Sequence, residues 1–140
     1  MKVDARYKHV MGGKVMISKD EELYNQEGLD VKQALEYVGD LDLYREILYD
    51  YYMAIDDKCQ RIRQFVEEKN LKEYTVQVHA VKSSSRMIGA SELAKEAEAL
   101  EMCGHSGDWG GIMEGTERML AHYLSYKPII EPHMEASEDL

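Results

Sequence analysis

One histidine of this chain has two cations placed around it at helical spacing. On a helix of about 3.6 residues per turn, positions i, i+3, i+4 and i+7 form one stripe, and here they are His79, Lys82, Ser83 and Arg86. The neighbouring stripe consists of Val78, Val81, Ser85 and Ile88. A helix that buries this second stripe turns much of the first toward solvent. The sequence therefore predicts an exposed imidazole, which is a nucleophile, beside an ammonium and a guanidinium.

The histidine also stands at the start of a longer motif. A His-x-x-Lys-small-Ser pattern is followed by a Gly-Ala pair, by a leucine at the third position after that pair, and by a Leu-Glu pair seven positions later. The residues concerned are His79, Lys82, Ser83, Ser84, Gly89, Ala90, Leu93, Leu100 and Glu101. Upstream, a Leu…Gly-Asp…Leu-Tyr…Leu pattern is formed by Leu35, Gly39, Asp40, Leu43, Tyr44 and Leu48. Over residues 30 to 125, the chain resembles the histidine-containing phosphotransfer (HPt) domain of bacterial two-component phosphorelays.

The resemblance implies a phosphorelay intermediate. His79 would accept a phosphoryl group from the aspartate of a receiver domain and pass it to another receiver. An imidazole that does this needs a free ring lone pair at about pH 7, and the oxygens of the transferring group need cations. Lys82, with a solvent-facing stem, is expected to stabilise that charge, and Ser83 and Arg86 are expected to lie on the receiver docking face.

The implied partners are response-regulator receiver domains and a histidine kinase. The chain is expected to carry phosphate without kinase activity of its own, because it contains no P-loop or other phosphate-cradling glycine-rich loop. No cofactor of its own is expected, and Mg²⁺ would come from the receiver, since no carboxylate cluster lies on the His79 stripe. No metal site is predicted either: Glu-x-x-His motifs are absent, and Cys103, His105 and His122 lack the paired spacing of zinc ligands.

Ser83 departs from the family pattern, in which glycine usually follows the lysine. Glycine keeps the surface beside the histidine low, so serine predicts slower or altered docking. A second hypothesis therefore stays open: a helical adaptor that binds a receiver or a histidine kinase and transfers no phosphate. Incubation with a phosphorylated receiver separates the two, because only a carrier gains an acid-labile, base-stable phosphohistidine.

His79 is expected to be the only phosphorylated histidine. The other four lack the surrounding motif and are expected to be ordinary surface residues; they are His9, His105, His122 and His133. Glu101 is expected to be a bundle-surface residue or a structural partner.

Composition limits the remaining possibilities. A formal charge of −10 disfavours a nucleic-acid partner that relies on phosphate neutralisation. The two cysteines have no paired spacing, which suits a reducing compartment. No apolar run approaches the length of a membrane span, and the N-terminus lacks the apolar core of a signal peptide. We predict a cytoplasmic monomer that does not insert into a membrane.

Apolar periodicity and turn residues predict an all-α fold. Asp30, Asp40 and Ser91 are expected to cap helices, and tyrosines at helical spacing in the LYREILYDYY segment are expected to be mostly core. Short helices are predicted at 20–26 and 31–38. Long helices are predicted from Leu41 to Asn70, from Leu71 to Gly89, from Ser91 to Gly104–Gly107, and after Asp108 up to Pro128. Short connections favour antiparallel neighbours, so the predicted architecture is an up-and-down four-helix bundle with one or two short N-terminal helices.

The ends of the chain lack this periodicity. We predict an N-terminal arm or linker at 1–20, the HPt-like bundle at 21–127 and an acidic tail at 128–140. Pro128 is expected to close the last helix, because proline removes a backbone donor and clashes with the preceding turn.

Overall fold

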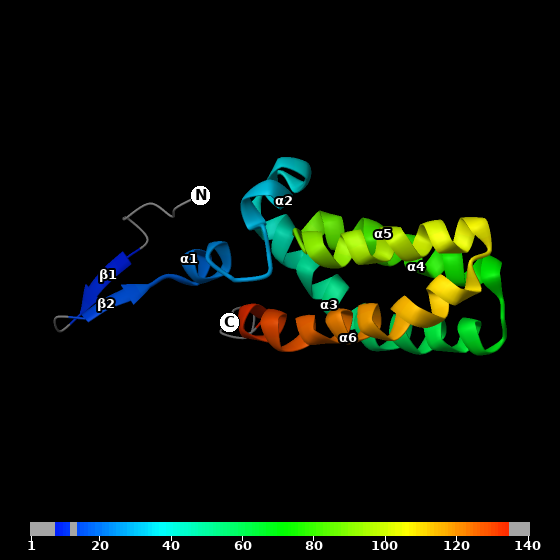
Figure 1. Ribbon diagram of the computed structural model, residues 1–140. Helices are drawn as coiled ribbons and strands as arrows, with labels where there is room; N and C mark the ends of the chain where they lie inside the picture. The colour runs from blue at the N-terminus through cyan, green and yellow to red at the C-terminus, as the bar shows by residue number, and fades with distance from the viewer. Residues whose placement is uncertain (1–7, 12–13, 135–140) are drawn as a thin grey trace.

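The computed structural model describes the backbone of residues 8–11 and 14–134 and the side chains of residues 18–134 (Figure 1). In this part of the chain, a two-stranded sheet is followed by six helices. The elements are β1 (Lys8–Met11), β2 (Lys14–Ile17), α1 (Lys19–Tyr24), α2 (Val31–Val38), α3 (Leu41–Glu67), α4 (Leu71–Ile88), α5 (Ser91–Ser106) and α6 (Trp109–Met134). The predicted helical fold is therefore confirmed from Lys19 to Met134. No helix in the described ranges is long and apolar enough to span a membrane.

Helix boundaries follow local capping chemistry. The Asp30 carboxylate accepts from the Gln33 N–H at 3.1 Å, and the Asp40 carboxylate from the Leu43 N–H at 2.8 Å, so both predicted caps are confirmed. The predicted cap at Ser91 is wrong. Ala90 occupies the N-cap position without a side-chain hydrogen bond, and Ser91 is the first residue of α5.

The N-terminal hairpin was not predicted. Strands β1 and β2 pair in antiparallel register, with Lys8 opposite Ile17 and Met11 opposite Lys14. Each strand has four residues, KHVM and KVMI, and neither shows the strict alternation of apolar and polar residues that marks a strand in a sequence. The remainder of the predicted arm, residues 1–7 and 12–13, lies outside the described residues.

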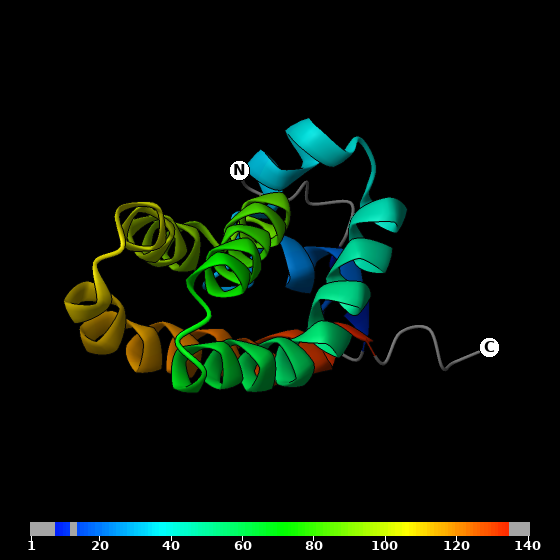
Figure 2. The same ribbon diagram turned by 90° about the vertical axis from the view of Figure 1, so that its right-hand side faces the viewer.

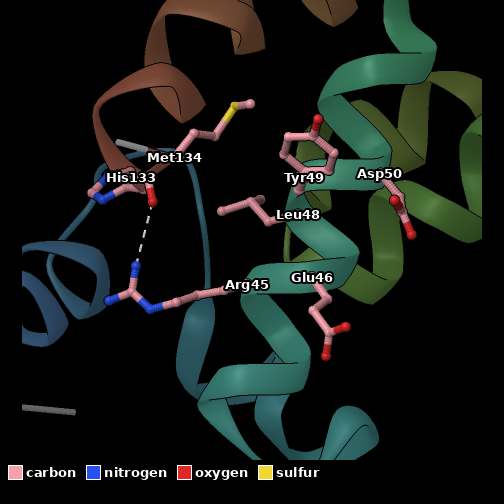
Figure 3. A pocket seen from close by; sticks show the side chains of 7 residues that line it. All are labelled: Arg45, Glu46, Leu48, Tyr49, Asp50, His133 and Met134. Carbon is pink, nitrogen blue, oxygen red and sulfur yellow. Dashed lines mark hydrogen bonds between the residues drawn. The ribbon is translucent and has the colours of Figure 1, made fainter. Parts of the chain in front are cut away.

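The last helix continues beyond Pro128. The prediction that it ends there is wrong, because α6 includes Pro128 and Pro132 and runs to Met134. The Arg45 side chain of α3 donates to the His133 backbone oxygen at 3.4 Å (Figure 3). Residues 135–140 of the predicted acidic tail lie outside the described residues.

Burial explains why proline does not stop α6. Tyr126, Ile130 and His133 continue the buried stripe of the helix past Pro128. The Tyr126 hydroxyl also donates to the Gly28 backbone oxygen at 2.6 Å, and His133 Nε2 lies 2.8 Å from Gln26 Oε1. Tertiary contacts supply most of a helix's stability in a folded protein, so they offset the lost backbone hydrogen bonds here.

The four long helices lie side by side (Figures 1 and 2). Each of the pairs α3–α4, α4–α5, α5–α6 and α3–α6 is in contact. Contacts run in opposite order along neighbouring helices: the start of α3 meets the end of α4, where the Tyr44 hydroxyl donates to the Ile88 backbone oxygen at 2.7 Å. The same order holds for α3 and α6. Tyr52, in the first half of α3, donates a hydrogen bond to Glu131 near the end of α6, whereas Arg63, near the end of α3, donates to Glu117 in the first half of α6.

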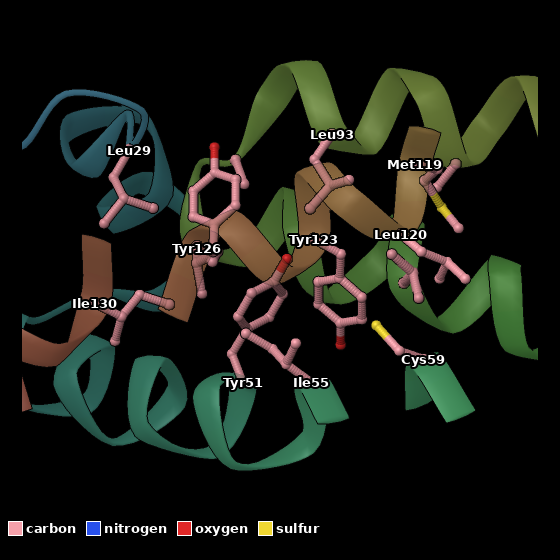
Figure 4. Packing of buried hydrophobic residues seen from close by; sticks show 14 of the residues in the cluster. Leu29, Tyr51, Ile55, Cys59, Leu93, Met119, Leu120, Tyr123, Tyr126 and Ile130 are labelled. Carbon is pink, nitrogen blue, oxygen red and sulfur yellow. The ribbon is translucent and has the colours of Figure 1, made fainter. Parts of the chain in front are cut away.

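Tyrosines form much of the core. Tyr44 and Tyr51 are buried, as predicted, whereas Tyr49 is exposed. Figure 4 shows the side chains of α3 pointing toward those of α6; the labelled ones are Tyr51, Ile55, Cys59, Met119, Leu120, Tyr123, Tyr126 and Ile130. The rings of Tyr51 and Tyr123 meet edge to face, with centroids 5.4 Å apart. This core fixes α3 and α6, and α4 and α5 pack against it.

Candidate functional site

The orientation of α4 is set by its apolar stripe. Val78, Val81, Ser85 and Ile88 are completely buried. Ser85 completes its hydrogen bonding with the Tyr51 hydroxyl of α3 at 2.8 Å. Burial of this stripe leaves 55% of the His79 side chain exposed. The predicted two-stripe arrangement is confirmed, and His79 is accessible to a partner molecule.

A carboxylate from α5 holds the His79 ring. Glu101 Oε2 lies 2.7 Å from His79 Nδ1, and Glu101 Oε1 lies 2.6 Å from Lys82 Nζ. A second imidazole, that of His105, places its Nε2 3.4 Å from the same Oε2. The Glu101 side chain is only 10% exposed, so these contacts replace most of its hydration.

The contacts fix the charge of Glu101. Burial alone would raise the pKa of this carboxyl, but the hydrogen bonds and charges of Lys82 and His79 outweigh it and lower the pKa to about 2. At neutral pH the group is therefore a carboxylate, which only accepts hydrogen bonds. The His79 ring in its neutral form must then carry its proton on Nδ1.

This tautomer leaves the other ring nitrogen free to react. With the proton on Nδ1, the free lone pair is on His79 Nε2, the ring nitrogen that does not face Glu101. When Nε2 forms a bond to an electrophile, the ring becomes positively charged while Nδ1 keeps its hydrogen bond. The anionic Glu101 stabilises that developing charge in a preorganised position. The geometry is that of an activated imidazole nucleophile.

Comparison with known families decides what kind of domain carries this imidazole. A family model described as Hpt domain matches residues 46–126, more than half of the chain. The chain belongs to the Hpt domain family. Hpt domains are the phosphocarriers of two-component signalling and interact with receiver domains and kinases. No curated protein and no solved structure matches the chain.

The matched region contains the whole site. It begins within α3 and ends within α6, so it includes His79, Lys82 and Glu101. It leaves out the hairpin, α1, α2 and the end of α6. Residues 18–134 contain no group of three or more His, Cys, Asp or Glu side chains placed to hold a metal ion.

The other predicted site residues occupy different environments. Lys82 is 14% exposed and its ammonium contacts Glu101, so the prediction of a solvent-facing stem is wrong. Burial against α5 causes this, because Glu101 draws the ammonium into the helix interface. Ser83 is exposed beside His79. Arg86 pairs with Glu98 at 3.0 Å, so the structure does not bring its guanidinium to His79.

Glu101 has a larger role in the site than the sequence predicted. It stands 22 residues from His79, on another helix, and helical spacing within one segment cannot pair such residues. The Leu-Glu pair of the family motif was the available signal. At Gly104 of α5, the helix lies so close to Thr75 of α4 that there is no room for a side chain: an added Cβ would lie 2.1 Å from Thr75 Oγ1. This close approach of α4 and α5 brings His79 and Glu101 together.

A second histidine shows what distinguishes His79. His122 Nδ1 also lies 2.7 Å from a carboxylate, that of Glu96. Its ring is 32% exposed and lies against the Tyr126 ring, with centroids 5.7 Å apart. No ammonium contacts Glu96 among the described residues, whereas Lys82 contacts Glu101. The Hpt site therefore combines an exposed imidazole, a carboxylate and an ammonium.

The buried Glu101 of the Hpt domain links stability to pH. Its pKa in the folded protein is about 2, below the ordinary value of 4.5, so the network stabilises the fold above about pH 4.5. This contribution, about 3 kcal/mol, is lost as the pH falls toward 2. Urea unfolding of the wild-type and Glu101→Gln proteins between pH 6 and about pH 2.5 should show the wild-type advantage shrinking by about three quarters of that amount. Parallel pH dependence in the two proteins would show that Glu101 is not held as an anion.

Proposed function

We propose that this Hpt domain is a phosphorelay intermediate. His79 Nε2 accepts a phosphoryl group from the aspartyl phosphate of one receiver domain and passes it to the aspartate of another. The observation that carries the proposal is the 2.7 Å contact between Nδ1 of an exposed His79 and the buried Glu101 carboxylate. This contact supports a free lone pair on Nε2 of an exposed ring, which a receiver could reach.

The proposed transfer step exchanges one bond to phosphorus for another. The Nε2 lone pair forms the N–P bond as the P–O bond to the receiver's aspartate breaks, and the aspartate leaves as a carboxylate. The ring keeps its proton on Nδ1 and becomes cationic, facing Glu101. Lys82 stands one turn after His79 and adds positive potential for the phosphoryl oxygens. Mg²⁺ would be supplied by the receiver, whose own acidic residues hold it.

We also propose the setting in which the domain works. The opposite order of contacts along neighbouring helices supports an up-and-down antiparallel course for α3 to α6. Cys59 and Cys103 are free thiols, which supports a reducing compartment such as the cytoplasm. We propose that the carrier acts there as a monomer, with no kinase activity of its own.

A transfer assay tests the proposal. Receiver domains of the source organism are phosphorylated on their aspartates with acetyl phosphate and mixed with the protein and Mg²⁺. A carrier gains a phosphoryl group that survives alkali and is lost in acid, and it then donates that group to an unphosphorylated receiver. Binding of a phosphorylated receiver without any transfer would instead show the adaptor function.

Ser83 tests where the receiver docks. It is exposed and one turn after His79, so a larger side chain there holds the aspartyl phosphate away from Nε2. Attack requires reacting atoms about 3 to 3.5 Å apart, and Ser83→Leu should lower kcat/KM for transfer by about 100-fold. Ser83→Gly should transfer faster than the wild type.

The control for Ser83 is Ser125, an exposed serine of α6. Ser125→Leu makes the same change away from His79 and should transfer at the wild-type rate. Thermal midpoints of all variants separate docking from folding, because Ser83→Gly should lose up to about 1 kcal/mol of helix stability. Wild-type transfer by Ser83→Leu would place the docking face elsewhere.

A further inference from the structure

A groove leads away from His79 along the interface of α4 and α5. It has a volume of about 740 Å³ and extends from His79 and Glu101 to the first residue of α4. The remaining lining residues are Leu71, Lys72, Thr75, Val76, Gly104 and His105. Thr75 and Gly104 approach each other closely, so the two helices themselves close the floor. The groove is therefore continuous with the phosphotransfer site.

The wall of the groove on α4 is apolar near His79 and cationic further away. Val76, one turn before His79, is 50% exposed. Lys72 lies one turn further and is exposed. Among residues 18–134, Lys72 has no carboxylate within ion-pair distance, whereas Lys82 and Arg86 on the same helix are both paired.

The charge of Lys72 contrasts with that of the whole chain. The formal net charge is −10, and the outward face of α3 carries Glu46 and Asp50 beside the exposed Tyr49. A partner that approached over the first half of α3, beside Tyr49, would therefore meet negative charge. A partner that approached over the α4–α5 groove would meet an apolar side chain and an ammonium that no carboxylate of residues 18–134 pairs with.

We propose that this groove selects among receiver domains by accepting a receiver surface segment that carries an apolar side chain next to a carboxylate. The inference rests on the proposed phosphotransfer function, because the occupant is the receiver that brings its aspartyl phosphate to His79. The apolar side chain packs on Val76, and the carboxylate pairs with Lys72. Contacts of this kind, remote from the reacting atoms, set which partner docks and how fast.

Charge and polarity changes in the groove test this assignment. The probe is the receiver domain that transfers fastest to the wild-type protein. Lys72→Glu and Val76→Asp should each raise KM for that receiver by about tenfold and leave kcat within about twofold. Neither residue contacts His79, Lys82 or Glu101 through a hydrogen bond or ion pair in the described part of the chain. Adding salt should weaken the Lys72 effect and spare the Val76 effect.

Two control variants match these changes outside the groove. Lys32 is exposed and is the second residue of α2, as Lys72 is of α4, so Lys32→Glu makes the same change at the same helix position. Met113 is 66% exposed and lies on α6, outside the groove. It stands one turn before Glu117, which pairs with Arg63 of α3. Met113→Asp is therefore the control for Val76→Asp, and both controls should transfer with the wild-type KM.

The outcomes separate the groove from the function. If the wild type accepts phosphate and the groove variants keep its KM, the groove assignment is overturned while the proposed function stands. An equal rise in KM for groove and control variants also overturns it, because total charge or polarity would then be the cause. If no receiver phosphorylates the wild type, the proposed function fails, and the groove assignment fails with it.

Discussion

A His79→Gln protein is expected to accept no phosphoryl group from any receiver and to remain folded. Glutamine has no ring nitrogen that can attack phosphorus, so the loss should be complete. The side chain is 55% exposed and makes its described polar contact with Glu101, which glutamine can also reach as a donor. Transfer of labelled phosphate from a phosphorylated receiver measures the first result, and a thermal melt within a few degrees of the wild type measures the second.

The control for His79 is the other histidine that pairs with a carboxylate. His122 also places Nδ1 2.7 Å from a carboxylate oxygen, that of Glu96. Because it lacks the ammonium and the exposure of His79, His122→Gln should accept phosphate at the wild-type rate. Phosphate on the His79→Gln protein, or loss of transfer in His122→Gln, would mean that the acceptor has been misassigned.

Gly104→Ala is expected to reduce both stability and transfer. An added Cβ would lie 2.1 Å from Thr75 Oγ1 and 3.0 Å from Thr75 Cβ. Thr75 cannot turn away without losing the hydrogen bond from its hydroxyl to the Leu71 backbone oxygen at 2.7 Å. The helices α4 and α5 must therefore separate, at an expected cost of about 1–3 kcal/mol. Separation also moves Glu101, one turn before Gly104, away from His79, and transfer should slow.

A glycine with free space around it provides the comparison. A Cβ added to Gly110, in the first turn of α6, would meet no atom closer than 3.5 Å, the Asp108 Oδ1. Gly110→Ala should be neutral or should stabilise the helix by up to about 1 kcal/mol. Urea unfolding and transfer rates of the two alanine variants test the account. Equal stability would show that α4 and α5 do not need the close approach at Gly104.

Local patterns predicted much of the fold because local interactions determine it. The caps at Asp30 and Asp40 depend on residues three positions apart, and the stripe from Val78 to Ile88 depends on one helix. Where tertiary contacts determine the length of a helix, the local sequence pattern was misleading. Pro128 reads as a helix end, but the buried Tyr126 and Ile130 around it keep α6 intact.

In the candidate site, too, features set within one helix were predicted and features set between two helices were not. The exposure of His79 follows from the apolar stripe of its own helix and was predicted. The position of Lys82 was not, because its burial depends on Glu101, a residue of the next helix. A pattern within one helix cannot give the distance between two helices, which here depends on the small size of Gly104 against Thr75.

The most direct test of the account is to identify the nitrogen that carries the phosphoryl group. The protein, labelled with ¹⁵N and phosphorylated by a receiver, can be studied by NMR, in which coupling between ³¹P and a ring nitrogen shows the site of attachment. Because Glu101 holds the proton on Nδ1, the account predicts phosphate on Nε2 of His79. Phosphate on Nδ1 of His79, or on any other histidine, would contradict it.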